Sequence, residues 1–150
     1  MNSRKILKQI RLIYFIVAIL LGVFAILSFV YVMQNGPMYE LNTNDKNNLK
    51  SLIIILALAG IPASHMFQSR KIKHLNKALD ASKKLLNYRM AYFVKIMTLE
   101  GISLLSLLGY LIIGNLNQLL IFAVVYLFLV LNYPKKSAIL EELNIDESEL

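Results

Sequence analysis

Residues 90–134 predict two membrane-spanning helices joined by a very short turn. They read MAYFVKIMTLEGISLLSLLGYLIIGNLNQLLIFAVVYLFLVLNYP. Residues 90–113 and 116–133 are each close to the roughly 20 apolar residues that an α-helix needs to cross the hydrocarbon of a bilayer. Because only Gly114-Asn115 separates the two runs, we expect the spans to be antiparallel neighbours. Pro134 cannot continue the second helix and marks its end.

Two more apolar runs precede this pair, at residues 10–33 and 49–67, and a loop rich in Asn lies between them. The chain is 57% hydrophobic and 17% charged, which is too apolar for an ordinary soluble domain. The sequence therefore predicts an all-α, polytopic membrane protein with four transmembrane helices in two antiparallel hairpins. We assign residues 1–133 to this transmembrane domain and residues 134–150 to a cytoplasmic tail that contains one short helix.

The distribution of Lys and Arg predicts how the helices are threaded. Thirteen of these residues lie before or at the start of the first span, between the second and third spans, or after Pro134, whereas two, Lys46 and Lys50, flank the first loop. Basic residues near span ends stay on the cytoplasmic side. We therefore expect a bacterial inner-membrane protein with both termini in the cytoplasm. The same asymmetry accounts for most of the net charge of +7, so nucleic acid is not an expected partner.

The connection at residues 68–89 is both basic and periodic. Apolar residues recur there at steps of three and four, as in Ile72, Leu75, Leu79 and Leu86, which predicts that the flanking spans continue as a helical hairpin beyond the membrane. Its basic face is expected to contact anionic lipid headgroups, and a docking surface for a partner protein is the alternative. The residues of this face are Arg70, Lys71, Lys73, Lys77, Lys83, Lys84 and Arg89.

Glu100 is the first candidate for a functional residue. A carboxylate inside a membrane span is costly, by about 2.5 to 3.5 kcal/mol on insertion scales, and Glu100 lies eleven residues from Arg89, near the expected midplane. Three readings stay open: a polar contact between spans two and three, a site that binds protons or ions, and a contact with a partner subunit. At helical spacing, a polar stripe continues from Glu100 through Ser103, Ser106 and Tyr110, and toward the cytoplasm through Tyr92 and Lys95.

The second span offers small residues at the same expected depth. Gly60 and Ser64 belong to a small-residue ridge of the kind that packs membrane helices closely. Pro62 lacks an N–H group and leaves the carbonyl of Leu58 without its helical donor. A protonated Glu100 is predicted to donate a hydrogen bond to this carbonyl.

His65 is predicted to lie at a depth comparable with Tyr92 and Lys95. As a single His it does not make a metal site, and a packed, hydrogen-bonded side chain is the simpler interpretation. A proton relay to Glu100 is the alternative.

Signatures of enzymes are missing from the sequence. It has no Gly-rich phosphate loop, no GxSxG elbow, no HExxH motif and no Cys, which excludes thiol catalysis and zinc–thiolate or iron–sulfur ligation by Cys. We predict no catalytic residue, no metal and no cofactor.

Two groups of membrane proteins resemble parts of the chain. Leu99-Glu100-Gly101, followed by Leu107-Leu108-Gly109-Tyr110, is similar to the carboxylate-bearing helix of the rotor proteolipids of rotary ATPases, but the alternating-glycine first helix of that family is absent. A larger part resembles a group of small four-span bacterial membrane proteins, which implies the four-span architecture and a use for Glu100 but no particular activity. The segments that carry it are Thr98-Leu99-Glu100-Gly101, Gly114-Asn115, Tyr133-Pro134-Lys135-Lys136 and Glu142-Leu143.

These observations predict a non-enzymatic accessory, assembly or interaction subunit of the inner membrane. Another membrane protein or a second copy of the chain is the expected partner. The alternative is a small proton-linked transporter or oligomeric channel component that uses Glu100.

Overall fold

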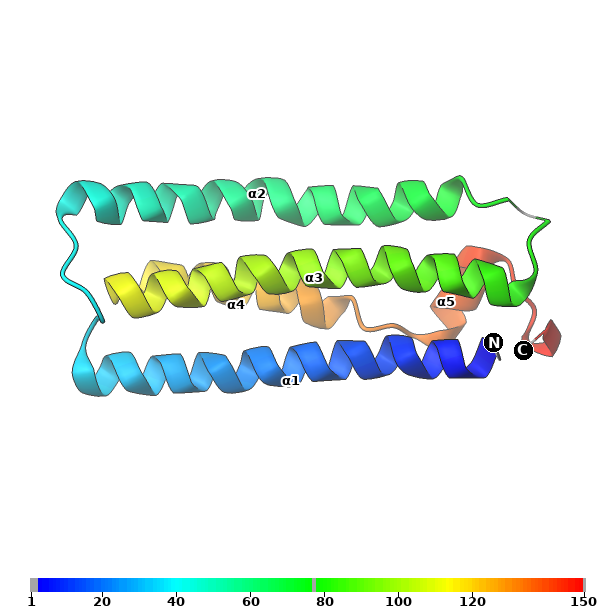
Figure 1. The fold of residues 1–150 in the computed structure, drawn as a ribbon, viewed down its shortest axis with the longest axis horizontal. Helices are drawn as coiled ribbons and strands as arrows, with labels where there is room; N and C mark the ends of the chain where they lie inside the picture. Colours follow the sequence, from blue (N-terminus) through cyan, green and yellow to red (C-terminus); the bar gives the residue numbers. More distant parts are fainter. Residues whose placement is uncertain (1–2, 77, 150) are drawn as a thin grey trace.

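The computed structural model describes residues 3–76 and 78–149, and the regular structure in them is helical. Three long helices are followed by a shorter one, a two-turn helix and a 3₁₀ turn (Figure 1). The prediction of an all-α chain is confirmed. The elements are α1 (Ser3–Asn35), α2 (Thr43–Lys73), α3 (Ala81–Ile113), α4 (Leu116–Leu131), α5 (Lys136–Leu143) and η1 (Glu147–Glu149).

Local signals in the sequence explain where the helices begin and end. The side chain of Asn42 accepts a hydrogen bond of 2.8 Å from the backbone N–H of Asp45, which caps the start of α2. Gly114 ends α3 with a φ of 68°, a left-handed conformation that favours glycine. Asn115 then caps α4 by accepting from the N–H of Asn117 at 2.9 Å. The turn between α3 and α4 is thus as short as predicted.

Helix α3 is the centre of the bundle. It packs against α1, α2 and α4, whereas α1 and α2 run on either side of it with almost no direct contact (Figure 1). The expected first hairpin is therefore not a packed pair. Its loop crosses the end of α3 instead, where the N–H of Met38 donates a 2.8 Å hydrogen bond to the carbonyl of Leu111.

The helices differ in their ability to cross a bilayer. Among the described residues, α1, α2 and α3 are long and apolar enough to span, and α4 with α5 passes the same test only as a pair bent by 71°. By itself α4 has 16 residues, about 24 Å, which is less than the roughly 30 Å of bilayer hydrocarbon. It ends at Leu131, two residues before the predicted boundary. Three to four helices can therefore cross a membrane.

The predicted helical connection at residues 68–89 is confirmed at both of its ends. Residues 68–73 belong to α2 and residues 81–89 to α3, and His74–Asn76 and Ala78–Asp80 are not helical. Lys77 lies outside the described residues. The predicted short helix of the tail is present as α5.

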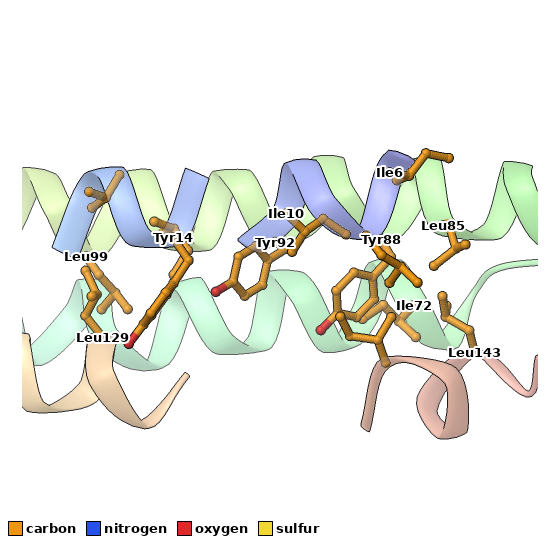
Figure 2. Packing of buried hydrophobic residues seen from close by; sticks show 14 of the residues in the cluster. Ile6, Ile10, Tyr14, Ile72, Leu85, Tyr88, Tyr92, Leu99, Leu129 and Leu143 are labelled. Atoms are coloured by element: carbon orange, nitrogen blue, oxygen red, sulfur yellow. The ribbon is translucent and has the colours of Figure 1, made fainter. Parts of the chain in front are cut away.

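The short α4 leaves a gap that α5 fills at the end of the bundle where the two termini lie (Figure 1). We call this the termini end. Figure 2 shows its core, in which Tyr88 and Tyr92 of α3 lie beside Ile10 of α1, and Leu143 of α5 lies near Ile72 of α2. All five side chains are buried.

Candidate functional site

Lys95 and His65 meet near the point where α4 ends. Lys95 projects from α3 and is only 4% exposed, and its Nζ lies 3.2 Å from Nδ1 of His65 on α2. The prediction that these two residues share one depth is confirmed. Their contact is a hydrogen bond, as predicted for His65, but the residue is exposed, so the prediction that its side chain is packed is wrong.

Polar groups from three other places surround this pair. The hydroxyl of Tyr92 donates a 2.9 Å hydrogen bond to the backbone carbonyl of Asn132, just beyond α4. Glu142 on α5 interacts electrostatically with Lys95 and His65. Partial burial raises the pKa of the Glu142 carboxyl above its ordinary value, and the two bases oppose that rise. We call His65, Lys95, Tyr92, Asn132 and Glu142 the basic cluster.

Two cavities adjoin the basic cluster. One, of about 550 Å³, lies among α2, α3 and α4 and has a mostly apolar lining that includes Pro62, Leu99 and Phe128. The other, of about 200 Å³, lies toward α5 and Glu142. His65, Lys95, Leu131 and Asn132 line both cavities. The ammonium of Lys95 is thus placed where an apolar cavity changes into a polar one.

Glu100 lies on another side of α3. A Cβ atom added to Gly60 of α2 would meet Ile102 and Thr98, so these two residues of α3 face α2. Each is two positions from Glu100, and two positions turn a helix by about 200°. The predicted hydrogen bond from Glu100 to the Leu58 carbonyl is therefore wrong: the depth matches, but the direction does not.

Glu100 instead faces toward α1. It lies eleven positions after Arg89, which places both residues on nearly the same side of α3. The Arg89 guanidinium donates a hydrogen bond to Gln9 of α1. Glu100 is partly exposed, and within the described residues it makes no hydrogen bond or ion pair.

The rest of the predicted polar stripe is buried away from Glu100. Ser103 is fully buried and its hydroxyl has no partner among the described residues, whereas the hydroxyl of Ser106 donates to the carbonyl of Ile102 at 2.9 Å. Tyr110 is buried as well. The structure thus brings Lys95 and His65 together and separates Glu100 from them.

Of the predicted packing residues, Gly60 and Ser64 lie where α2 approaches α3, whereas Pro62 is exposed. The Cβ added to Gly60 would come within 2.5 Å of Ile102 Cδ1, so a larger residue does not fit without rearrangement. Pro62 lies inside a continuous α2, and the buried hydroxyl of Ser64 donates to the carbonyl of Ile61 at 2.7 Å.

The basic residues of the connection flank the turn between α2 and α3. His74 Nδ1 lies 2.8 Å from the carbonyl of Arg70, which ties the end of α2 to the turn. Most of these side chains are exposed. Arg70, Lys71 and Lys73 lie on the last turns of α2, and Lys83, Lys84 and Arg89 lie on the first turns of α3.

Three residues gain importance only from the structure. Asn132 and Glu142 join the basic cluster because the chain bends after α4, and no pattern in the sequence predicts that bend in space. Gln118 is completely buried beside Gly109, and its amide has no hydrogen-bond partner in residues 3–76 and 78–149.

The chemistry available to the basic cluster is binding of charge and donation of hydrogen bonds. Within the described part of the chain, no three His, Asp or Glu side chains are close enough to hold a metal ion together. No family model, no curated protein and no solved structure matches the chain. The function proposed below therefore rests on the geometry of this chain.

Proposed function

We propose that the chain is a non-enzymatic, multi-pass protein of the bacterial inner membrane that acts as an accessory or assembly subunit by binding another membrane protein. One observation carries this proposal. Glu100 is a partly exposed carboxyl in an apolar helix and has no partner among the described residues. Such a group inside a membrane is costly unless something pairs with it. A donor from another protein is the simplest source of that pairing.

The surface beside Glu100 suits an incoming helix. Between α1 and α2, one side of α3 is left uncovered, and a Cβ added to Gly101 would meet no atom within 4 Å. This side, which we call the open face, is apolar. Its exposed residues are Phe93, Val94, Gly101, Leu105 and Leu108.

The proposed occupant is a transmembrane helix of a different protein that carries a hydroxyl, amide or cationic donor. A second copy of the chain fits less well, because a two-fold contact across the open face would bring two Glu100 carboxyls together. A partner of different sequence supplies the donor and covers the apolar surface. Small residues such as Gly101 allow close approach of membrane helices.

Photo-cross-linking in native membranes tests this assignment. A photoreactive residue replaces Gly101 on the open face, and Leu58, which is 72% exposed on α2, serves as the matched lipid-facing control. We expect one discrete adduct of higher mass at Gly101 and none at Leu58. Equal, diffuse labelling by lipid at both positions would contradict the proposal, and an adduct with the mass of two chains would identify a homodimer instead.

The proposed orientation has both termini in the cytoplasm, and the charge asymmetry supports it. Cysteines are placed at the exposed positions Thr43 and Asn117, in the first turns of α2 and α4, and at Asn87 on the first part of α3. An impermeant thiol reagent is expected to label intact cells at Thr43 and Asn117 only. Labelling at Asn87 would reverse the orientation.

The alternative, a proton-linked transporter, requires a hydrated path to Glu100. The geometry supports it less, because Lys95, to which His65 of α2 is bonded, lies about 140° around α3 from Glu100, and the two residues do not form a relay to it. Glu100→Gln separates the two functions, since glutamine keeps hydrogen bonding but cannot ionise. If Glu100→Gln still binds its partner but the proton-linked function of the protein is lost, the transporter is favoured.

A further inference from the structure

We propose that the larger cavity at the basic cluster binds an anionic phospholipid, with an acyl chain against its apolar wall and the headgroup phosphate on the ammonium of Lys95. This site is independent of Glu100 and of the open face, which lie on another side of α3.

Lys95 is a buried cation that forms no close ion pair among the described residues, because the Glu142 carboxylate acts on it from more than 4.0 Å away. It is 4% exposed, and in the described ranges no carboxylate oxygen comes within 4.0 Å of its ammonium. An ammonium offers three donors, of which one points to His65 at 3.2 Å. A buried charge needs compensation by an opposite charge and by hydrogen bonds. An anion that enters the cavity provides both.

Like a lipid molecule, the cavity has an apolar part and a polar end. Ile61, Pro62, Leu99 and Phe128 supply an apolar wall, and Lys95 with Asn132 supplies a polar end. Its volume of about 550 Å³ falls within the roughly 300 to 1,000 Å³ of typical ligand sites, and it is far larger than an inorganic ion requires. Leu131 at its rim is 71% exposed, so the cavity opens toward the surrounding lipid.

Aromatic residues indicate that this polar end lies at headgroup level. The ring centroid of Tyr133 is 5.4 Å from that of Tyr14 and 5.9 Å from that of Phe15, and α4 ends beside them. Tyr side chains concentrate at membrane interfaces, where one end of the ring is apolar and the other wet. Basic pockets between membrane helices at this level recognise lipid headgroups.

A phospholipid fits better than a free fatty acid because the cavity has two parts. The acyl chain fills the larger apolar part, and the smaller cavity beyond Lys95, of about 200 Å³ and lined by Gln68, Ser69 and Glu142 among others, receives the polar group beyond the phosphate. A fatty-acid carboxylate ends at Lys95 and leaves that second space without a ligand group.

Lipid binding to the purified full-length chain in mild detergent tests the proposal. Phosphatidylglycerol, phosphatidylethanolamine with the same acyl chains, and oleate are titrated, and bound lipid is counted by native mass spectrometry. Phosphatidylglycerol is expected to bind about tenfold more tightly than phosphatidylethanolamine, as one desolvated charge contact suggests. Equal affinity for these two lipids would overturn the proposal, and stronger binding of oleate would overturn the choice of a phospholipid.

Variants then locate the site. Lys95→Met keeps the length of the side chain without its charge and should remove the preference for phosphatidylglycerol, whereas Lys95→Arg should keep it. Lys50→Met, at the opposite end of α2, is the matched control for loss of one charge. If Lys95→Met does not fold, Leu131→Glu at the exposed rim replaces it, because its carboxylate competes with the phosphate. Retention of the preference in Lys95→Met or Leu131→Glu would place the lipid elsewhere.

Discussion

Lys95 and Glu100 lie five residues apart on the same helix, yet their surroundings are opposite. Lys95 is buried and bonded to His65, and groups from α2, α4 and α5 surround it. Glu100 is partly exposed and has no partner within the described chain. Five residues turn a helix by about 500°, which leaves the two side chains about 140° apart. We infer that α3 has a packed side, stabilised within the chain, and an open side that needs an external partner.

The largest difference in unfolding free energy between the packed and the open side of α3 is expected when a glycine on each side is replaced by leucine. Gly60→Leu forces atoms into the contact with Ile102 and should lower the free energy of unfolding in detergent by about 1 to 3 kcal/mol. Gly101→Leu adds the same atoms on the open face, where a Cβ meets nothing within 4 Å, and should have little effect on the isolated chain. Equal losses in reversible unfolding would remove the distinction between a packed and an open side.

A smaller effect is expected from the hydroxyl that joins α3 to the end of α4. Tyr92→Phe removes the donor to the Asn132 carbonyl and leaves that acceptor unpaired, which should cost about 1 kcal/mol of unfolding free energy. Tyr39→Phe, in the exposed loop after α1, is the control. A silent Tyr92→Phe would mean that water replaces the tyrosine and that the packed side is wetter than inferred.

The smallest effect on stability is expected at Glu100. Glu100→Leu and Glu100→Gln break no hydrogen bond or ion pair among the described residues, so both should change the unfolding free energy by less than about 0.5 kcal/mol. Thermal or denaturant unfolding in one detergent measures this for both variants. A loss above about 1.5 kcal/mol would reveal an intramolecular partner and would place Glu100 on the packed side.

Much of the fold follows from local features of the sequence. Long apolar runs predict α1, α2 and α3, and Gly114-Asn115 predicts the tight turn before α4, because chain length and backbone conformation act locally. Counting residues from the basic span ends also predicts that Gly60 and Glu100 share a depth, and that His65 and Lys95 do so. Both estimates of depth are confirmed. Gly60 lies beside Ile102 and Thr98, the residues on either side of Glu100 along α3, and His65 is bonded to Lys95.

The sequence does not predict which neighbouring helix each side of α3 faces. Helical periodicity gives the angle between two residues of α3, but not which neighbouring helix lies at that angle. That choice depends on α3 being the central helix, with α1 and α2 on either side of it. The sequence therefore predicts the wrong neighbour for Glu100, α2 in place of α1. The parts that Asn132 and Glu142 play in the basic cluster likewise depend on the bend after α4, which is set by tertiary packing.

The size of the complex in native membranes tests the central claim most directly. Membranes that contain the parent chain or Glu100→Leu are solubilised in one mild detergent and compared by native gel electrophoresis at matched abundance. The parent is expected in a complex clearly larger than its own 17.1 kDa, and Glu100→Leu is expected to run as the chain alone. A parent that runs alone, or a complex of unchanged size in Glu100→Leu, would contradict the proposal that Glu100 pairs with a membrane partner.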